Sequence, residues 1–232
     1  MTDYIPERKQ YYVVLRGAFN PLMFQPEWFG RNDVIAHEEV TYARNQSNAQ
    51  PTIVTPQLTL FRTTQFIVTV DSATFQVVAQ KEPLVTLKDF VRKTFEKLGG
   101  ITIGAYGLNF SAHYKFANEE LINTFADRLA PKQYWRSLLG DDINSKNRKG
   151  GLTSIQMHKF KDNNEGNISI LLEQSAHVRP GIWLACNDHV NVNENDSEAE
   201  IAIEKLASTF DGSFECMKKI QLDLIMETMK DE

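Results

Sequence analysis

Alternating apolar and polar residues predict most of the strands in this chain. The clearest pattern covers three neighbouring runs, Leu58–Phe61, Phe66–Val70 and Phe75–Ala79, which are joined by short polar turns. Tyr11–Leu15 is an earlier run of aromatic and β-branched residues, and Ile101–Phe116 alternates over a longer distance. Because successive side chains of a strand point to opposite faces, this alternation indicates strands with one buried face. The three neighbouring runs predict an antiparallel meander.

The last third of the chain carries a second pattern of this kind. Thr153–Lys161, Ile168–Glu173 and Ile182–Val192 are predicted strands, separated by turn-forming residues. A further short strand is expected at Glu39–Tyr42, followed by a polar loop over residues 45–51. The strands therefore occur in adjacent groups and do not alternate strictly with helices.

Apolar residues recurring every three or four positions predict the helices. One helix begins near Thr86 and ends at the Gly99–Gly100 pair. Thr86 and the aspartate three residues later have the spacing of a capping box. Asn118 is expected to cap a second helix that ends before Pro131. A short third helix is predicted over residues 134–139, and the polar segment 140–151 after it is expected to be a solvated loop.

The longest predicted helix covers most of the C-terminal part of the chain. Ser197 and Glu200 have the spacing of a capping box, and Gly212 is a residue at which the helix could bend or break. One apolar stripe runs along this helix and requires burial against the sheet or a second subunit. Its residues are Leu206, Phe210, Phe214, Met217, Ile220 and Leu224.

Grouped strands followed by helices indicate an α+β fold, in which an antiparallel sheet carries helices on one side and a long C-terminal helix. We expect residues 1–232 to form a single domain. Because both halves place strands before a helix, a divergent duplication of roughly 10–116 and 117–232 is an alternative interpretation. No residue-level repeat supports that alternative.

Composition adds limits to this picture. The chain has 232 residues, of which 42% are hydrophobic, so it can bury a full core without disulfides or metals. Its two cysteines, Cys186 and Cys216, lack disulfide and metal-ligand spacing and are expected to be reduced. The formal net charge of −5 argues against nucleic acid as a partner. No signal peptide or membrane span is recognised, and we expect a cytoplasmic protein.

Common catalytic motifs are missing, including phosphate-binding glycine loops, dinucleotide fingerprints and nucleophile elbows. The remaining candidates are polar residues of predicted strands, namely His113, His158, Asp188 and His189. Adjacent strands could bring three of them together as metal ligands or as an acid–base pair. Scattered histidines of this kind are more often surface residues or hydrogen-bonded core residues, so no catalytic residue, metal or cofactor is assigned.

Asp188 is in phase with the apolar residues of its strand. In a regular strand its carboxylate faces the buried side, where it needs a partner such as Arg179, Arg16 or a backbone donor. A bulge that turns Asp188 outward is the alternative. Both structural interpretations are favoured over catalysis, since perturbed carboxylates mark active sites only in a minority of cases.

The segment Asn20–Gly30 combines two prolines with several large apolar residues. Proline lacks an amide hydrogen, so we expect an irregular loop here. Phe24, Trp28 and Phe29 have two alternative roles in this loop. They fill an edge of the core, or they form an exposed aromatic site that binds a partner.

A resemblance to a known family rests on three features. These are the run Asn20-Pro-x-x-Phe-Gln-Pro-x-Trp-Phe, the residues Asn187-Asp188-His189 near the last strand, and the long terminal helix. Together they resemble a sporadically distributed family of uncharacterised bacterial proteins, sometimes encoded beside multicomponent or defence-type systems. The resemblance implies an accessory subunit and carries no catalytic residues.

Three functions follow as hypotheses. The first is a non-enzymatic interaction protein or accessory subunit of a bacterial multicomponent system, such as antiviral defence, with a protein partner or a second copy. The second is a metal-dependent hydrolase or nuclease that uses the strand residues His113, His158, Asp188 and His189. The third is a ligand-binding domain with an apolar cavity between the sheet and the long helix.

Overall fold

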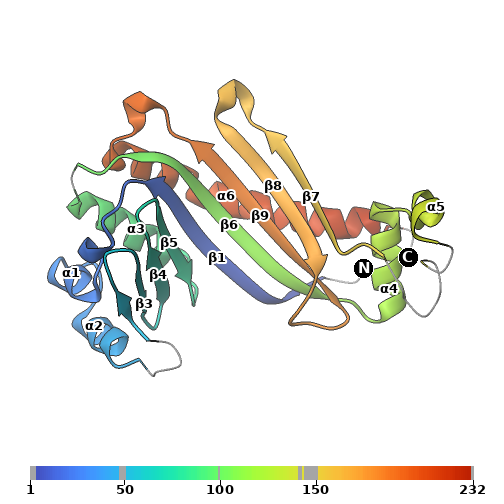
Figure 1. The fold of residues 1–232 in the computed structure, drawn as a ribbon, viewed down its shortest axis with the longest axis horizontal. Coiled ribbons are helices and arrows are strands. Elements are labelled where there is room, and N and C mark those ends of the chain that lie inside the picture. Colours follow the sequence, from blue (N-terminus) through green and yellow to red (C-terminus); the bar gives the residue numbers. More distant parts are fainter. Residues whose placement is uncertain (1–3, 47–50, 99, 141–142, 144–150, 231–232) are drawn as a thin grey trace.

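The computed structural model describes residues 4–46, 51–98, 100–140, 143 and 151–230. Its strands join in one nine-stranded antiparallel sheet with the order β2-β3-β4-β5-β1-β6-β9-β8-β7 (Figure 1). The strands are β1 (Pro6–Gly17), β2 (Ile53–Val54), β3 (Thr59–Arg62), β4 (Phe66–Val70), β5 (Thr74–Ala79), β6 (Ile103–Lys115), β7 (Ser154–Phe160), β8 (Gly166–Gln174) and β9 (Gly181–Asn191).

Helices cover one face of this sheet, which confirms the predicted α+β class. The long C-terminal helix packs mainly against β6 and β9, and a shorter helix lies beside it on β5. The α-helices are α1 (Pro26–Arg31), α2 (His37–Arg44), α3 (Val85–Lys97), α4 (Glu119–Leu129), α5 (Arg136–Leu139) and α6 (Ala199–Thr228). Single 3₁₀ turns are η1 (Pro21–Met23), η2 (Lys132–Tyr134), η4 (Asp162–Asn164) and η5 (Glu194–Asp196).

The two halves of the chain have the same connectivity. β1 is followed by the meander β3–β5, whose last strand pairs with β1, and then by α3. β6 is followed by the meander β7–β9, whose last strand pairs with β6, and then by α6. β1 and β6 pair antiparallel at the centre of the sheet. The repeat therefore divides the chain between α3 and β6, earlier than the expected division at residues 116 and 117.

α6 binds the sheet through the predicted apolar stripe, although the stripe turns along the helix. Phe210, Phe214 and Met217 are at most 1% exposed, whereas Ile220 and Leu224 are only half-buried. Gln221 takes the buried position in this part of the helix. Its side-chain amide donates to the carbonyl oxygens of two strand residues and accepts from a tyrosine hydroxyl on β6. The helix is continuous, so Gly212 does not break it.

Residues 20–44 differ from the sequence-based expectation. Both prolines of the segment stand in the first turn of a short helical element, η1 or α1, where the missing amide hydrogen costs nothing. The strand expected at Glu39–Tyr42 is wrong, because these residues belong to α2. α2 has acidic residues in its first turn and buries Val40 against α1, so tertiary packing outweighs the β-branched composition.

The capping box expected at Thr86 is also wrong, whereas the cap at Asn118 is confirmed. α3 begins at Val85, and the Thr86 hydroxyl donates to the carbonyl of Pro83. α6 begins at Ala199, with Glu198 at its N-cap position. Asn118 accepts a hydrogen bond from the amide of Leu121, 2.9 Å away, at the start of α4. The expected loop over 140–151 lies largely outside the described residues.

Candidate interaction surface

Asp188 faces the helix layer, as the alternation along its strand predicts. It lies opposite Leu108 in a regular ladder between β6 and β9, so no bulge turns it outward. Its carboxylate pairs with the ammonium group of Lys161 and accepts a hydrogen bond of 2.5 Å from the hydroxyl of Ser213 on α6. The expected partners Arg16 and Arg179 are not used. Asp188 therefore ties the β7–β8 turn and β9 to the middle of α6.

His189 and His158 lie on the other face of the sheet, which α6 does not cover. The Nε2 atom of His189 is 3.1 Å from the side-chain oxygen of Asn191. His158 is exposed on β7, where its ring contacts Phe160. Neither histidine shares a face of the sheet with Asp188. Asp188 and His189 are neighbours in the sequence, but their side chains cannot contact the same substrate or metal.

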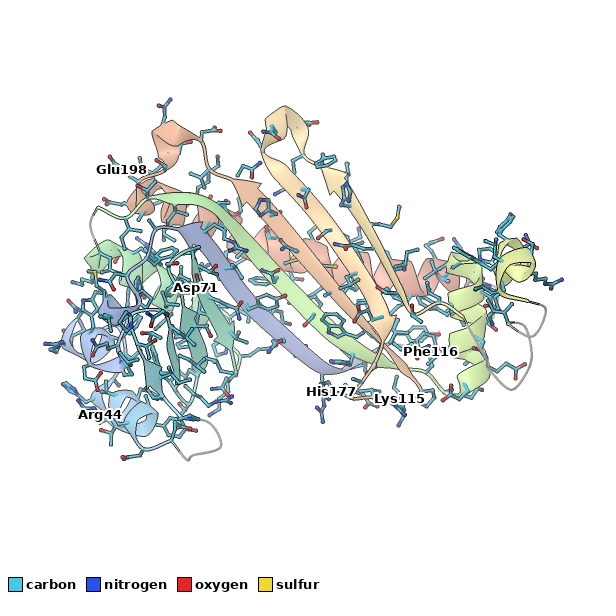
Figure 2. All side chains as sticks on the ribbon, in the orientation of Figure 1. Arg44, Asp71, Lys115, Phe116, His177 and Glu198 are labelled. Carbon is cyan, nitrogen blue, oxygen red and sulfur yellow. The ribbon has the colours of Figure 1, made fainter. Side chains whose placement is uncertain are left out.

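His113 belongs to a separate cluster at the far end of the sheet. Its Nδ1 atom is 2.8 Å from the hydroxyl of Ser175, and its ring packs edge-on against that of His177. His177 lies in the connection between β8 and β9 (Figure 2). Burial lowers the pKa of His113, with His177 and Arg8 adding to the effect, so the imidazole is neutral at pH 7. The Ser175 hydroxyl also accepts a hydrogen bond of 2.8 Å from the backbone amide of Val178. This serine therefore holds the β8–β9 turn.

The four polar candidates do not converge. His113 lies opposite Trp183 and His189 lies six residues further along β9, a separation of about 20 Å at 3.4 Å per residue. Among the described residues, no group of three His, Cys, Asp or Glu side chains is arranged to hold a metal ion. The described residues therefore provide no metal site for the metal-dependent hydrolase hypothesis.

Cys186 is a buried cysteine whose sulfur accepts a hydrogen bond from the side-chain amide of Gln221 at 3.5 Å. It lies in β9 beneath α6, and burial raises the pKa of its thiol to about 11. A neutral thiol is a poor nucleophile, so Cys186 acts as a small apolar residue of the core.

The aromatic segment after β1 fills the core at one edge of the sheet. Phe24 and Phe29 are fully buried, and Trp28 is half-buried with its ring 5.1 Å from that of Phe29. Phe29 also stacks on Phe90 of α3 at 5.2 Å. Phe24 and Phe29 therefore do not form an exposed aromatic site. Their rings fill the core between the sheet and α3.

The largest concentration of exposed apolar side chains lies instead on η2 and α5. Tyr134 is 71% exposed, Trp135 48%, Leu138 74% and Leu139 62%. We call these four residues the α5 patch. It lies at the end of the molecule opposite to α1 and α2 (Figure 1). Large exposed apolar patches are uncommon on monomeric proteins.

The repeat in connectivity makes this exposure unusual. α1 and α2 follow the first strand of the N-terminal half, and α4 and α5 follow the first strand of the C-terminal half. The first insertion buries Phe24 and Phe29 in the core, whereas the second leaves the α5 patch exposed. Trp135 and Leu139 border a hollow of about 230 Å³, which also contacts Leu152 and Ser154 at the start of β7.

Sequence reasoning predicted the helix here without identifying the patch. The positions 134, 135, 138 and 139 lie on one face of a helix, which is also the spacing of a core helix. What distinguishes the two is the exposure of these side chains, since no helix or strand in the described part of the chain covers them.

Comparisons with known proteins do not identify a relative. No protein-family model matches the chain, and no curated protein sequence matches it. No helix among the described residues is long and apolar enough to cross a membrane.

Proposed function

We propose that this protein is a non-enzymatic interaction subunit that binds a partner protein through the α5 patch. The observation that carries the proposal is the exposure of four large apolar residues within six positions, Tyr134 to Leu139. Tryptophan and tyrosine are enriched at interfaces, where burying each one contributes more than most other side chains. The bacterial multicomponent assembly suggested by the family resemblance is the proposed context.

The chemistry of the patch indicates what the partner presents. Arg136 is a basic residue within the α5 patch, whereas the ammonium group of Lys132 pairs with Asp127 at 3.0 Å. The complementary surface is therefore an apolar groove with an acidic group opposite Arg136. The aromatic side chains supply the central contacts, and Arg136 orients the partner.

A pair of matched variants tests this proposal. Leu138→Glu places a charge in the α5 patch, and Val85→Glu places the same charge at a 48% exposed valine at the start of α3. Both side chains are solvent-exposed, so both variants are expected to melt at the wild-type temperature in circular dichroism. Affinity capture from the native cell, followed by mass spectrometry, should lose a specific protein with Leu138→Glu and keep it with Val85→Glu.

Two results would contradict the proposal. One is the same set of captured proteins with the wild type and with Leu138→Glu. The other is a loss that both variants share, which would indicate a general effect of added charge.

A further inference from the structure

β7 forms an open edge of the sheet that is long and regular. Its seven residues pair with β8 without a bulge, from Ser154 opposite Glu173 to Phe160 opposite Asn167. No strand among the described residues pairs with its outer side. Six of its seven residues are exposed. Unpaired edges of this kind add strands from other chains unless proline, bulges, charged residues or short length prevent it, and Lys159 is the one such protection within β7.

The edge at the other end of the sheet is different. β3, the counterpart of β7 in the repeated connectivity, is covered by β2, with Ile53 opposite Leu60. β2 has only two residues, so the outermost edge there is short. β7 is therefore the edge at which strand addition is possible over several residues.

Apolar side chains project from both faces of β7. Met157 is 66% exposed and lies on the face that carries the helices, next to Ile170 of β8. Phe160 is 70% exposed and lies on the opposite face. An added strand would cover both side chains.

We propose that the occupant is a second copy of this chain, whose β7 pairs antiparallel with the first about a two-fold axis at Met157. In this register Met157 lies opposite its own copy, Gln156 opposite His158, and Ile155 opposite Lys159. Lys159 is the only Lys, Arg, Asp or Glu between Ser154 and Phe160, so no like charges lie opposite each other. The two nine-stranded sheets become one continuous sheet.

Charged substitutions at the two-fold axis give a direct test. Met157→Lys and Met157→Glu each place like charges opposite each other, and each variant alone is expected to be monomeric by sedimentation velocity. Mixed in equal amounts, they are expected to form a heterodimer with the mass of the wild-type dimer. Because Met157 is exposed in one chain, both variants should keep the wild-type circular dichroism spectrum.

Controls on the same protein exclude other interfaces. Met226→Lys changes a 51% exposed methionine on α6 and should leave the dimer intact, as should Leu138→Glu in the α5 patch. Retention of this dimer in Leu138→Glu also separates the present inference from the proposed function.

A cross-link then defines the register. In a Cys216→Ser background, Met157→Cys should form a disulfide-linked dimer on oxidation, because directly opposed residues of antiparallel strands have Cα atoms about 4.5–5.5 Å apart. Lys159→Cys should not, since residue 159 is displaced from its copy by four residues, or about 14 Å along the strand. A monomeric wild type, a dimer that persists in Met157→Lys, or variants that fail to recombine would each overturn the proposal.

Discussion

Asp188 illustrates how far a single residue can be interpreted from sequence. Its phase within β9 predicts a carboxylate on the buried face, and the structure places it there. Its partners could not be predicted in the same way. Lys161 lies 27 residues earlier, beyond the turn between β7 and β8, and Ser213 lies 25 residues later on α6. Neither belongs to a pattern that links it to Asp188 in the sequence.

The pairing of Lys161 with Asp188 predicts a measurable loss of stability. Lys161→Met leaves a carboxylate that is 12% exposed with only the Ser213 hydroxyl. We expect a decrease of about 1–3 kcal/mol in the free energy of unfolding, less than for a fully buried pair because the lysine is partly solvated. Denaturant titration measures this loss. Lys219→Met, an exposed substitution on α6, should change stability by less than about 0.5 kcal/mol, and equal effects of the two would show that the ion pair has no role.

Among the elements, most strands and the short helix at residues 134–139 were predicted, whereas α1 and α2 were not. Alternation along β4 and β9 reports burial directly, because every second side chain of these strands lies in the core. β6 differs from the expectation of one buried face, because its residues from Tyr106 to Ala112 are buried on both faces of the sheet. α2 has eight residues and buries only Val40 and Ala43, so its sequence carries little helical periodicity. Its conformation is decided by packing against neighbouring elements.

The apolar stripe of α6 predicts the outcome of a substitution at its centre. Phe214 is 1% exposed, and its ring lies 5.4 Å from Tyr11 on β1 and 4.8 Å from Phe210. Phe214→Ala is expected to lower the free energy of unfolding by about 3–5 kcal/mol, measured by denaturant titration, and Phe214→Asp is expected to prevent folding.

Met226→Asp on the exposed side of the same helix provides the comparison, since Met226 is 51% exposed. It should remain soluble, with a melting temperature close to that of the wild type. A folded Phe214→Asp protein with an unchanged melting temperature would mean that this face of α6 is not core.

At the scale of the whole molecule, the two halves share one sheet and one core. β1 and β6 pair along most of their length, and Lys88 of α3 bonds to Asp211 of α6 at 2.7 Å. Tyr11 of the first half contacts Phe214 of the second. Separation of the two halves would expose the apolar surface of both to water.

We therefore expect the chain to unfold as one cooperative unit. Differential scanning calorimetry should give a single transition in which the calorimetric and van't Hoff enthalpies agree. Strands β1 and β6 lie at the junction of the halves, so separation of the halves would remove an eleven-pair ladder. Two resolved transitions would show instead that the repeated units are independently stable.

The sequence by itself determined the α+β class, the two meanders and the long C-terminal helix, because each depends on the local periodicity of burial. For Asp188 it left an inward carboxylate and an outward bulge as alternatives, and the regular ladder of β9 decides for the first. It did not determine which strands are neighbours, since the pairing of β1 with β6 and of β9 with β6 joins residues far apart in the chain. Nor did it distinguish Phe24 and Phe29, which are buried, from Trp135 and Leu138, which are exposed. All four are large apolar residues close to a proline in the sequence. Whether such residues form a core or a binding surface depends on whether another part of the chain covers them, and only the tertiary structure decides that.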